Sequence, residues 1–221
     1  MARRNRSFAV IGLGRFGSKL ALELAGYGNH VLGIDSDERL VSAVANSISQ
    51  AVIADARDER ALREAGIAGF DAAIIAIGAN LEASILCQLN LKNMGMQQVT
   101  VKASDKKHAR ILEALGATDI VVPEDDAGEH VAQRLHNPLI YDFMRISDGN
   151  YVALIEAQKA YFQKTLQDLN NLGHLKAECL GIMRGDTYMN PATHQGEKLA
   201  HGDRLLVQGS RSDIRAFADA K

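Results

Sequence analysis

The chain has 221 residues, 47% of them hydrophobic and 24% charged, with a formal net charge of −2. This length suits one large domain or two small ones, and the near-neutral charge argues against nucleic acid as a partner. No apolar stretch reaches the roughly 18 residues that a membrane span needs, and the first residues lack the apolar core of a signal peptide. The two cysteines form no CxxC pattern, so we expect a cytoplasmic protein with reduced thiols.

The first predicted element is a buried strand over Phe8–Ile11, which runs into a Gly-x-Gly-x-x-Gly motif and a helix over Arg15–Tyr27. In this motif Gly12 permits the tight turn, Gly14 lets the backbone approach a pyrophosphate, and Gly17 lets the helix pack closely on the strand. The helix N-terminus offers unpaired N–H groups and a partial positive charge to an anion. The motif predicts a nucleotide site, and the alternative is a tight strand–helix turn without a ligand.

A second apolar strand, His30–Ile34, ends at Asp35, which lies 18 residues after Gly17. An acid at this place accepts hydrogen bonds from ribose hydroxyls. Because a carboxylate repels a 2′-phosphate, Asp35 fits a free 2′-hydroxyl and argues against NADP.

Strand-like and helix-like segments alternate from there to about Pro123. This rhythm predicts an α/β fold, a Rossmann-like doubly wound parallel sheet of six strands. The further strands are expected at Ala51–Ala54, Ala72–Ile77, Val99–Val101 and Ile120–Val122, and the further helices at Asp37–Asn46, Asp58–Ala65, Leu81–Met94 and Lys106–Leu115.

The pattern changes after Pro123 and predicts a small C-terminal α+β domain. We place the boundary near Leu135–Asp142, which gives domains of residues 1–136 and 137–221. A helix is expected at Asp126–Leu135, a connecting segment at Tyr141–Ser147, strands at Tyr151–Ala157, Glu178–Met183 and Arg204–Val207, and helices at Thr165–Leu172 and Ser212–Ala218.

Several polar or glycine residues stand at strand ends, where open α/β sheets bind their ligands. Asp55 could contact an adenine edge or serve as a helix N-cap. Ile77 and Gly78 end the fourth strand, where Gly78 would let the backbone come close to a ligand. Lys102 ends the fifth strand, as a phosphate partner or as a solvated lysine. We expect all of these residues to converge on one crevice with the glycine motif.

Two charged groups flank this crevice. Arg15, followed by Phe16, lies inside the glycine loop and should face the phosphates, although an exposed position at the helix start is the alternative. Glu124, Asp125 and Asp126 follow the sixth strand. Carboxylates near phosphates can hold a hard divalent cation, and the alternative for Asp125 and Asp126 is helix N-capping.

The sequence contains no recognisable catalytic constellation. The seven histidines lie in no catalytic motif, and GxxxxGK[ST], GxSxG and HExxH are absent. A dehydrogenase would also need a general acid or base at a substrate cleft. These observations count against an NAD-dependent oxidoreductase, which stays the alternative function.

Taken in order, these motifs resemble the RCK (regulator of potassium conductance) family, and more narrowly the cytosolic subunits of Ktr/Trk-type bacterial potassium uptake systems. The resemblance covers nearly the whole chain, including its C-terminal part. It rests on Phe8–Gly17, Ile75–Ala79, Val101–Ala103, Val122–Glu124, Leu180–Arg184, Asn190–Pro191 and Gly202–Gly209.

The resemblance implies a protein that is not an enzyme, namely a cytosolic, nucleotide-sensing regulatory subunit on the inner face of the cell membrane. Such subunits form an octameric ring of dimers and gate a membrane potassium translocating subunit as ATP, ADP or NAD(H) changes the ring's shape. By position, Gly12, Gly14 and Gly17 would hold phosphates, and Asp35 the ribose. Cofactor-binding residues are then expected at Gly12, Gly14, Arg15, Phe16, Gly17, Asp35, Asp55, Ile77, Gly78 and Lys102, with Arg15 reaching the γ-phosphate and Glu124 holding a divalent cation at a subunit interface.

The same resemblance raises cyclic di-AMP as a ligand of the C-terminal domain. Arg184 and the pair Asn190-Pro191 fit part of the family pattern for this ligand. Glu178 and Cys179 stand where family members carry aliphatic residues, and Ile182 replaces an expected acid.

Overall fold

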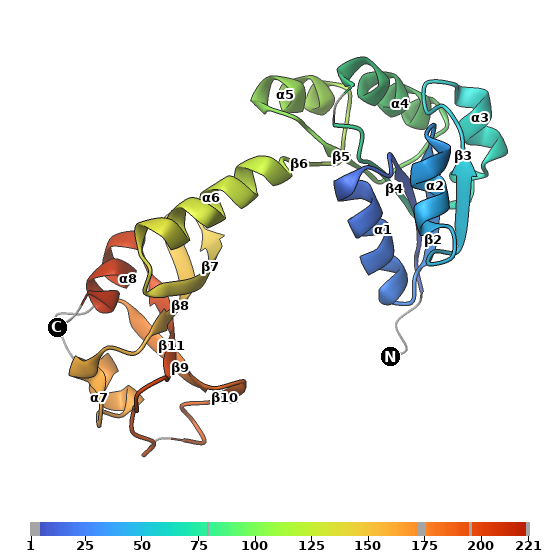
Figure 1. The fold of residues 1–221 in the computed structure, drawn as a ribbon. Helices are drawn as coiled ribbons and strands as arrows, with labels where there is room; N and C mark the ends of the chain where they lie inside the picture. Colours follow the sequence, from blue (N-terminus) through green and yellow to red (C-terminus); the bar gives the residue numbers. More distant parts are fainter. Residues whose placement is uncertain (1–4, 79, 172–175, 195, 220–221) are drawn as a thin grey trace. The chain divides into compact units, whose positions relative to one another are not determined.

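The computed structural model of the chain describes residues 5–78, 80–171, 176–194 and 196–219. Ala79 of the motif after the fourth strand and Leu172, the expected end of a short helix, lie outside the described residues. The chain divides into two compact units, Met1–Glu124 and Asp125–Lys221, called here the N-terminal and C-terminal units (Figure 1).

The N-terminal unit is a six-stranded, fully parallel sheet in the order β3-β2-β1-β4-β5-β6. This confirms the predicted Rossmann-like fold, with the first strand at the centre. The strands are β1 (Ser7–Ile11), β2 (His30–Asp35), β3 (Gln50–Ile53), β4 (Ala72–Ile75), β5 (Val99–Lys102) and β6 (Asp119–Val121). The helices are α1 (Arg15–Gly26), α2 (Glu38–Val44), α3 (Glu59–Glu64), α4 (Leu81–Asn93) and α5 (Lys106–Ala114), with a short 3₁₀ turn η1 (Ile67–Gly69).

Helices cover both faces of this sheet. Because neighbouring residues of a strand point to opposite sides, each strand contributes to the core on both faces. On β1, Val10 belongs to a core shared with residues of α1 and α2, such as Ala21 and Val41. The next residue, Ile11, belongs to a second core with residues of α3, α4 and α5, such as Leu62, Leu91 and Leu112. Because the six strands are parallel, their carboxyl ends lie along one edge of the sheet, between the two helical layers.

Four helices of the N-terminal unit begin with a short polar side chain that accepts a hydrogen bond from a backbone N–H of the first turn. Such N-caps satisfy donors that have no partner inside the helix. The residues are Asp37 for α2, Asp58 for α3, Asn80 for α4 and Asp105 for α5.

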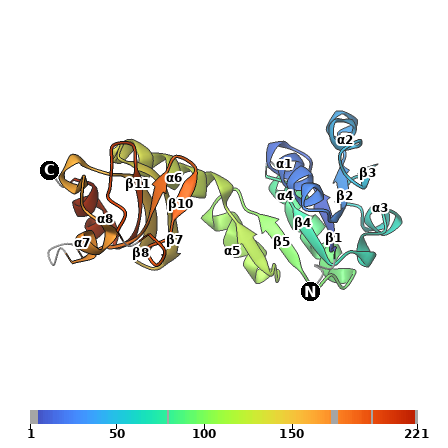
Figure 2. The same cartoon turned by 90° about the horizontal axis from the view of Figure 1, so that it is seen from below.

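The C-terminal unit is built on a five-stranded antiparallel sheet in the order β10-β9-β11-β8-β7. Helix α8 packs against β8 and β11 (Figure 2), and α7 packs against β9. Inside the core, the hydroxyl of Tyr161 donates to the carbonyl of Phe217 at 2.9 Å. The elements are β7 (Ile140–Ser147), β8 (Asn150–Glu156), η2 (Lys159–Tyr161), α7 (Leu166–Asn170), β9 (Glu178–Arg184), β10 (Thr187–Met189), β11 (Arg204–Gly209) and α8 (Arg211–Ala218).

Two strands of this sheet differ from the sequence analysis. The segment Tyr141–Ser147, expected to be a connection, forms most of the edge strand β7, and β10 was not predicted at all. Most residues of β7 are exposed, so this strand lacks the apolar run by which a buried strand is recognised.

Helix α6 (Pro123–His136) begins earlier than the expected Asp126, at a proline, whose missing N–H is no loss in the first turn of a helix. Its side chains interact with the C-terminal unit. Glu129 pairs with Arg211, and the ring of His130 stacks on Phe143 with 5.2 Å between centroids. Because of these contacts the division of the chain falls at the start of α6, earlier than the boundary expected near Leu135–Asp142.

Candidate functional site

The glycine motif forms a tight loop between β1 and α1. Gly12 has a φ of +94°, and its N–H donates to the carbonyl of Ile34 at 2.8 Å. A Cβ on Gly17 would lie 1.8 Å from the Gly12 carbonyl oxygen, so only glycine lets α1 pack this closely on the loop. Gly14 is the N-cap of α1, and a Cβ there would meet no atom within 4 Å. The protein's own packing thus requires Gly17, whereas the space beside Gly14 is open.

Asp35 is tied to this loop. One of its carboxylate oxygens, Oδ2, accepts from the backbone N–H of Leu13 at 2.6 Å, and Oδ1 accepts from the N–H of Asp37 at 2.9 Å. The side chain is half-buried at the end of β2. A carboxylate offers about four lone-pair sites, so Asp35 can accept further hydrogen bonds from a ligand while it fixes the loop.

Lys102 crosses the edge of the sheet from the end of β5. Its Nζ is 2.6 Å from Oε1 of Glu124 and 5.7 Å from the ring centroid of Phe16. A Cβ on Gly78 would lie 3.1 Å from the same nitrogen, so the missing side chain of Gly78 makes room for Lys102. The Lys102 side chain is only 12% exposed, which contradicts the alternative of a solvated lysine.

Arg15 is exposed in the first turn of α1. The hydrogen bond from Lys102 lowers the pKa of Glu124 below its ordinary range, and a backbone hydrogen bond and the charges of Lys102 and Arg15 add to this effect. Positive charge from β5 and from the glycine loop therefore converges on the first turn of α6. An anionic ligand in the loop would compete with Glu124 for both cations.

The side chains of the two apolar residues expected at the site, Phe16 and Ile77, pack against other parts of the N-terminal unit. Phe16 lines a groove of about 660 Å³ together with Leu20 and Ile74, on the face of the sheet that carries α1. Ile77 packs against the core shared with α3, α4 and α5. The Phe16 ring also lies 5.7 Å from Lys102 Nζ, so it borders the strand-end edge as well as the groove.

Glu124 does not by itself fit a divalent cation. Such ions take several oxygen ligands, usually from more than one carboxylate. The Glu124 carboxylate accepts a hydrogen bond from the Lys102 ammonium group. The described residues contain no group of three His, Cys, Asp or Glu side chains that could hold a metal ion. A cation at Glu124 would need ligands from another molecule.

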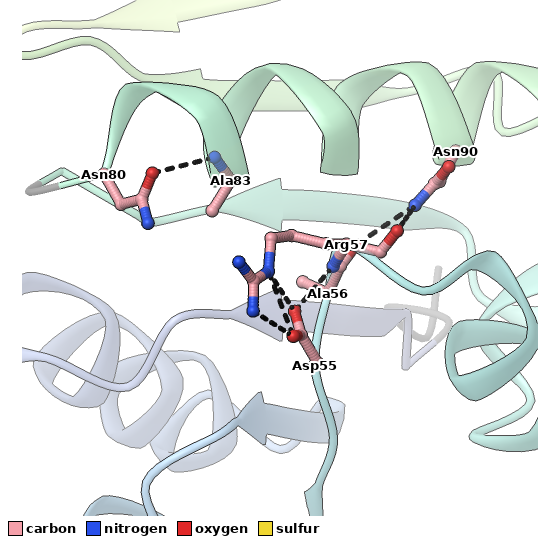
Figure 3. Close-up of polar contacts among 6 residues, drawn as sticks. All are labelled: Asp55, Ala56, Arg57, Asn80, Ala83 and Asn90. Carbon is pink, nitrogen blue, oxygen red and sulfur yellow. Dashed lines mark hydrogen bonds and ion pairs between the residues drawn. The ribbon is translucent and has the colours of Figure 1, made fainter.

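Asp55 is not the N-cap of α3, since Asp58 fills that position. Its carboxylate instead forms a forked ion pair with Arg57, in which Nη2 and Oδ2 are 2.6 Å apart (Figure 3). Hydrogen bonds from the Arg57 side chain and backbone lower the pKa of Asp55. Asn90 of α4 holds the same loop by donating to the carbonyls of Ala56 and Arg57, at 3.2 and 3.0 Å.

The sequence analysis did not identify Arg57 or Asn90, the two residues that hold the loop after β3. Arg57 follows Asp55 by two residues, the spacing of an Asx turn, so a local signal existed. Asn90 stands more than thirty positions away within a helix, and no local pattern links it to the loop.

The residues that fit part of the cyclic di-AMP pattern have partners within the C-terminal unit. Arg184 donates through Nε and Nη2 to the two oxygens of Asp203, both at 2.9 Å, and also pairs with Glu197. These carboxylates raise the pKa of Arg184, with Asp203 the larger cause. Asn190 accepts from the N–H of Ala192 at 2.8 Å, in a turn. Arg184 therefore has an internal role as a clamp between β9 and the loop before β11.

No helix in the described part of the chain is both long and apolar enough to cross a bilayer.

Comparison with known proteins gives concordant relatives. The model of the TrkA-N domain matches residues 8–123. The Ktr system potassium uptake protein A of Bacillus subtilis (strain 168) is 36% identical over 215 residues, which cover 97% of this chain and 96% of that protein.

Solved structures share the fold. The GsuK RCK domain superposes with a TM-score of 0.62 at 12% identity, covering 99% of this chain and 48% of that one. A GsuK channel bound to NAD gives a TM-score of 0.60 at 13% identity, covering 98% of this chain and 39% of that one. The chain shares the fold of the RCK domain, has a Ktr system potassium uptake protein among its relatives, as its sequence motifs indicated, and belongs to the TrkA-N domain family.

Proposed function

We propose that this protein is a cytosolic, nucleotide-sensing regulatory subunit that gates a membrane potassium transporter. The observation that carries the proposal is the loop between β1 and α1. Gly17 closes this loop against α1, while the space beside Gly14 at the helix N-terminus is open. A helix N-terminus with open space in front of it is a ready anion site. A full-length relative named as a potassium uptake protein supports the transport role.

In this proposal the phosphates lie on the loop from Gly12 to Gly17, and the ribose hydroxyls donate to Asp35. The base extends toward Asp55 at the end of β3. The backbones of Phe16, Ile77 and Gly78 line the edge of the sheet. ATP or ADP is the proposed ligand, and a solved RCK channel whose name includes NAD supports NAD(H) as a competitor for the same fold.

The sensing step rests on Arg15, Lys102 and Glu124. A third phosphate adds negative charge where Arg15 and Lys102 already converge, and it would weaken the 2.6 Å contact between Lys102 and Glu124. Glu124 lies in the first turn of α6, the helix that leads into the C-terminal unit. A nucleotide shifts such an equilibrium only by its difference in affinity for the two arrangements. ATP and ADP should therefore favour different positions of α6.

The proposed assembly is an octameric ring of dimers beneath a membrane potassium translocating subunit, which would place the protein on the inner face of the membrane. A divalent cation would enter only where a neighbouring copy adds ligands to Glu124. Cyclic di-AMP is the weaker part of the proposal, because it would have to compete for Arg184 with two carboxylates.

The test is isothermal titration of the purified chain with ATP, ADP, NADH and cyclic di-AMP, together with size-exclusion chromatography. Adenine nucleotide binding by an assembly near eight subunits, with different elution for ATP and ADP, would support the proposal. Exclusive NAD(H) binding by a monomer or dimer, with hydride transfer to a small alcohol or hydroxy acid, would favour the oxidoreductase instead.

A further inference from the structure

The loop after β3 carries a preformed ion pair at the place where the base is proposed to lie. Arg57 Nε donates to both carboxylate oxygens of Asp55 at 3.0 Å, and Nη2 donates to Oδ2 at 2.6 Å. The Arg57 backbone N–H adds a bond to Oδ1 at 2.9 Å. Asn90 fixes the backbone of the same loop by donating to the carbonyls of Ala56 and Arg57 (Figure 3). The pair therefore stands on a loop that is anchored to α4.

This pair lies one strand beyond the proposed ribose site. In the parallel register Ile53 of β3 is opposite Asp35 of β2, and the N–H of Ala54 donates to the Asp35 carbonyl at 3.0 Å. Neighbouring strands are about 4.8 Å apart, so Asp55 stands within the reach of a base whose ribose is bound at Asp35.

We propose that Arg57 sets the base specificity of the nucleotide site by competing with the adenine amino group for the Asp55 carboxylate. This inference rests on the proposed nucleotide-binding function. The amino group at C6 of adenine donates hydrogen bonds, whereas the oxygen at C6 of hypoxanthine accepts them. A carboxylate only accepts and a guanidinium only donates. Asp55 alone would favour adenine strongly, and Arg57 moderates that preference by occupying Asp55 and by offering donors to a 6-oxo base.

The geometry lets Arg57 exchange partners. Its Nη1 group makes no contact with Asp55 and can donate to a ligand. The Arg57 and Asp55 side chains are 51% and 45% exposed, and ion pairs so exposed are weak and open easily. Glu82 in the first turn of α4 is near enough to contribute to the raised pKa of Arg57, after the larger effect of Asp55. Arg57 thus has a second anion nearby when a base takes its place on Asp55.

The test compares ATP with inosine triphosphate, which differ at C6 of the base, by titration of the full chain. We expect Arg57→Ala to bind ATP about threefold more tightly and inosine triphosphate about threefold more weakly, so that the ATP preference rises about tenfold. Arg60→Ala is the matched control, because it removes an exposed arginine of α3 close by in sequence. The control should change both affinities equally and leave the preference unchanged. Arg57→Gln, which keeps most of the side chain, should act in the same direction as Arg57→Ala.

An unchanged preference in both Arg57 variants, with ATP still bound, would overturn the inference and leave the proposed function standing. A parallel loss of affinity for both nucleotides would do the same, because it would mean that Arg57 acts through its charge alone. Failure of the unsubstituted chain to bind any nucleotide would overturn the proposed function itself. If the chain binds only a dinucleotide, NAD and nicotinamide hypoxanthine dinucleotide provide the same contrast.

Discussion

Gly17→Ala should damage the N-terminal unit through one contact. The new Cβ would lie 1.8 Å from the Gly12 carbonyl oxygen, whereas real Cβ contacts essentially never fall under 3.0 Å, so α1 would have to move by at least 1.2 Å, the difference between the two distances. The Gly12 carbonyl oxygen belongs to the backbone, so it cannot move aside by rotation of a side chain. Overpacking of this kind costs about 1–3 kcal/mol, and the better helix propensity of alanine recovers only about 0.5–1 kcal/mol.

We therefore expect Gly17→Ala to lower the free energy of unfolding by about 1–2 kcal/mol, which corresponds to a fall of about 2–8 °C in the melting temperature. Thermal unfolding followed by circular dichroism measures this change. Gly26→Ala is the matched control on the same helix, because a Cβ at Gly26 would meet no atom within 4 Å. The control should melt at or slightly above the temperature of the unsubstituted chain. Equal melting of both variants would refute the argument that Gly17 is required by packing.

Gly14→Asp should retain the fold, since aspartate is a favoured N-cap and the space beside Gly14 is open. Because the new carboxylate would repel phosphate, the substitution should weaken ATP binding at least about tenfold in a titration, and undiminished binding would mean that the phosphates do not lie on this loop. Arg15→Ala should weaken ATP more than ADP, and equal losses would exclude Arg15 from sensing the γ-phosphate. Burial lowers the pKa of His108 below its ordinary value of 6.5. The unfolded chain therefore binds the extra proton first, and stability that is complete above about pH 6.5 is lost as the pH falls toward the folded pKa. The melting temperature should drop between about pH 7.5 and about pH 5.5, and less so in His108→Asn; identical pH dependence in both proteins would contradict this. Burial raises the pKa of the Cys87 and Cys179 thiols to about 12, so an aromatic disulfide reagent at mildly alkaline pH should label them only as fast as the chain opens, and immediate labelling would show them accessible.

Local sequence patterns gave the strand–helix alternation of the N-terminal unit with good accuracy. The predicted strand Phe8–Ile11 and helix Leu81–Met94 correspond to β1 and α4 within about two residues at each end. The predictions were poorer in the C-terminal unit. There the edge strands β7 and β10 are mostly exposed, and their formation depends on hydrogen bonds to β8 and β9 rather than on an apolar pattern.

The candidate site likewise has one part that could be predicted from the sequence and one part that could not. That a glycine loop and Asp35 would stand together could be inferred because a parallel sheet brings strand ends to one edge. That Glu124 would pair with Lys102 could not be inferred, because the two residues are twenty-two positions apart and the pairing depends on where β6 ends and α6 begins.

The sequence by itself determined the elements whose cause is local. Alternating apolar runs, Asx helix caps and the spacing of Gly12, Gly14 and Gly17 act within a few residues of the chain, so they can be recognised in the sequence alone. Only the tertiary structure decided which side chains meet at the strand ends. Lys102 lies across Gly78 against Glu124, Arg57 occupies Asp55, and Arg184 is held by Asp203. Three of these side chains had been considered for a phosphate, a base edge or a cyclic dinucleotide. The charges of Lys102, Asp55 and Arg184 are paired within the chain. Packing brings Glu124 to Lys102 and Asp203 to Arg184 from other segments, whereas Arg57 reaches Asp55 from two residues along the same loop.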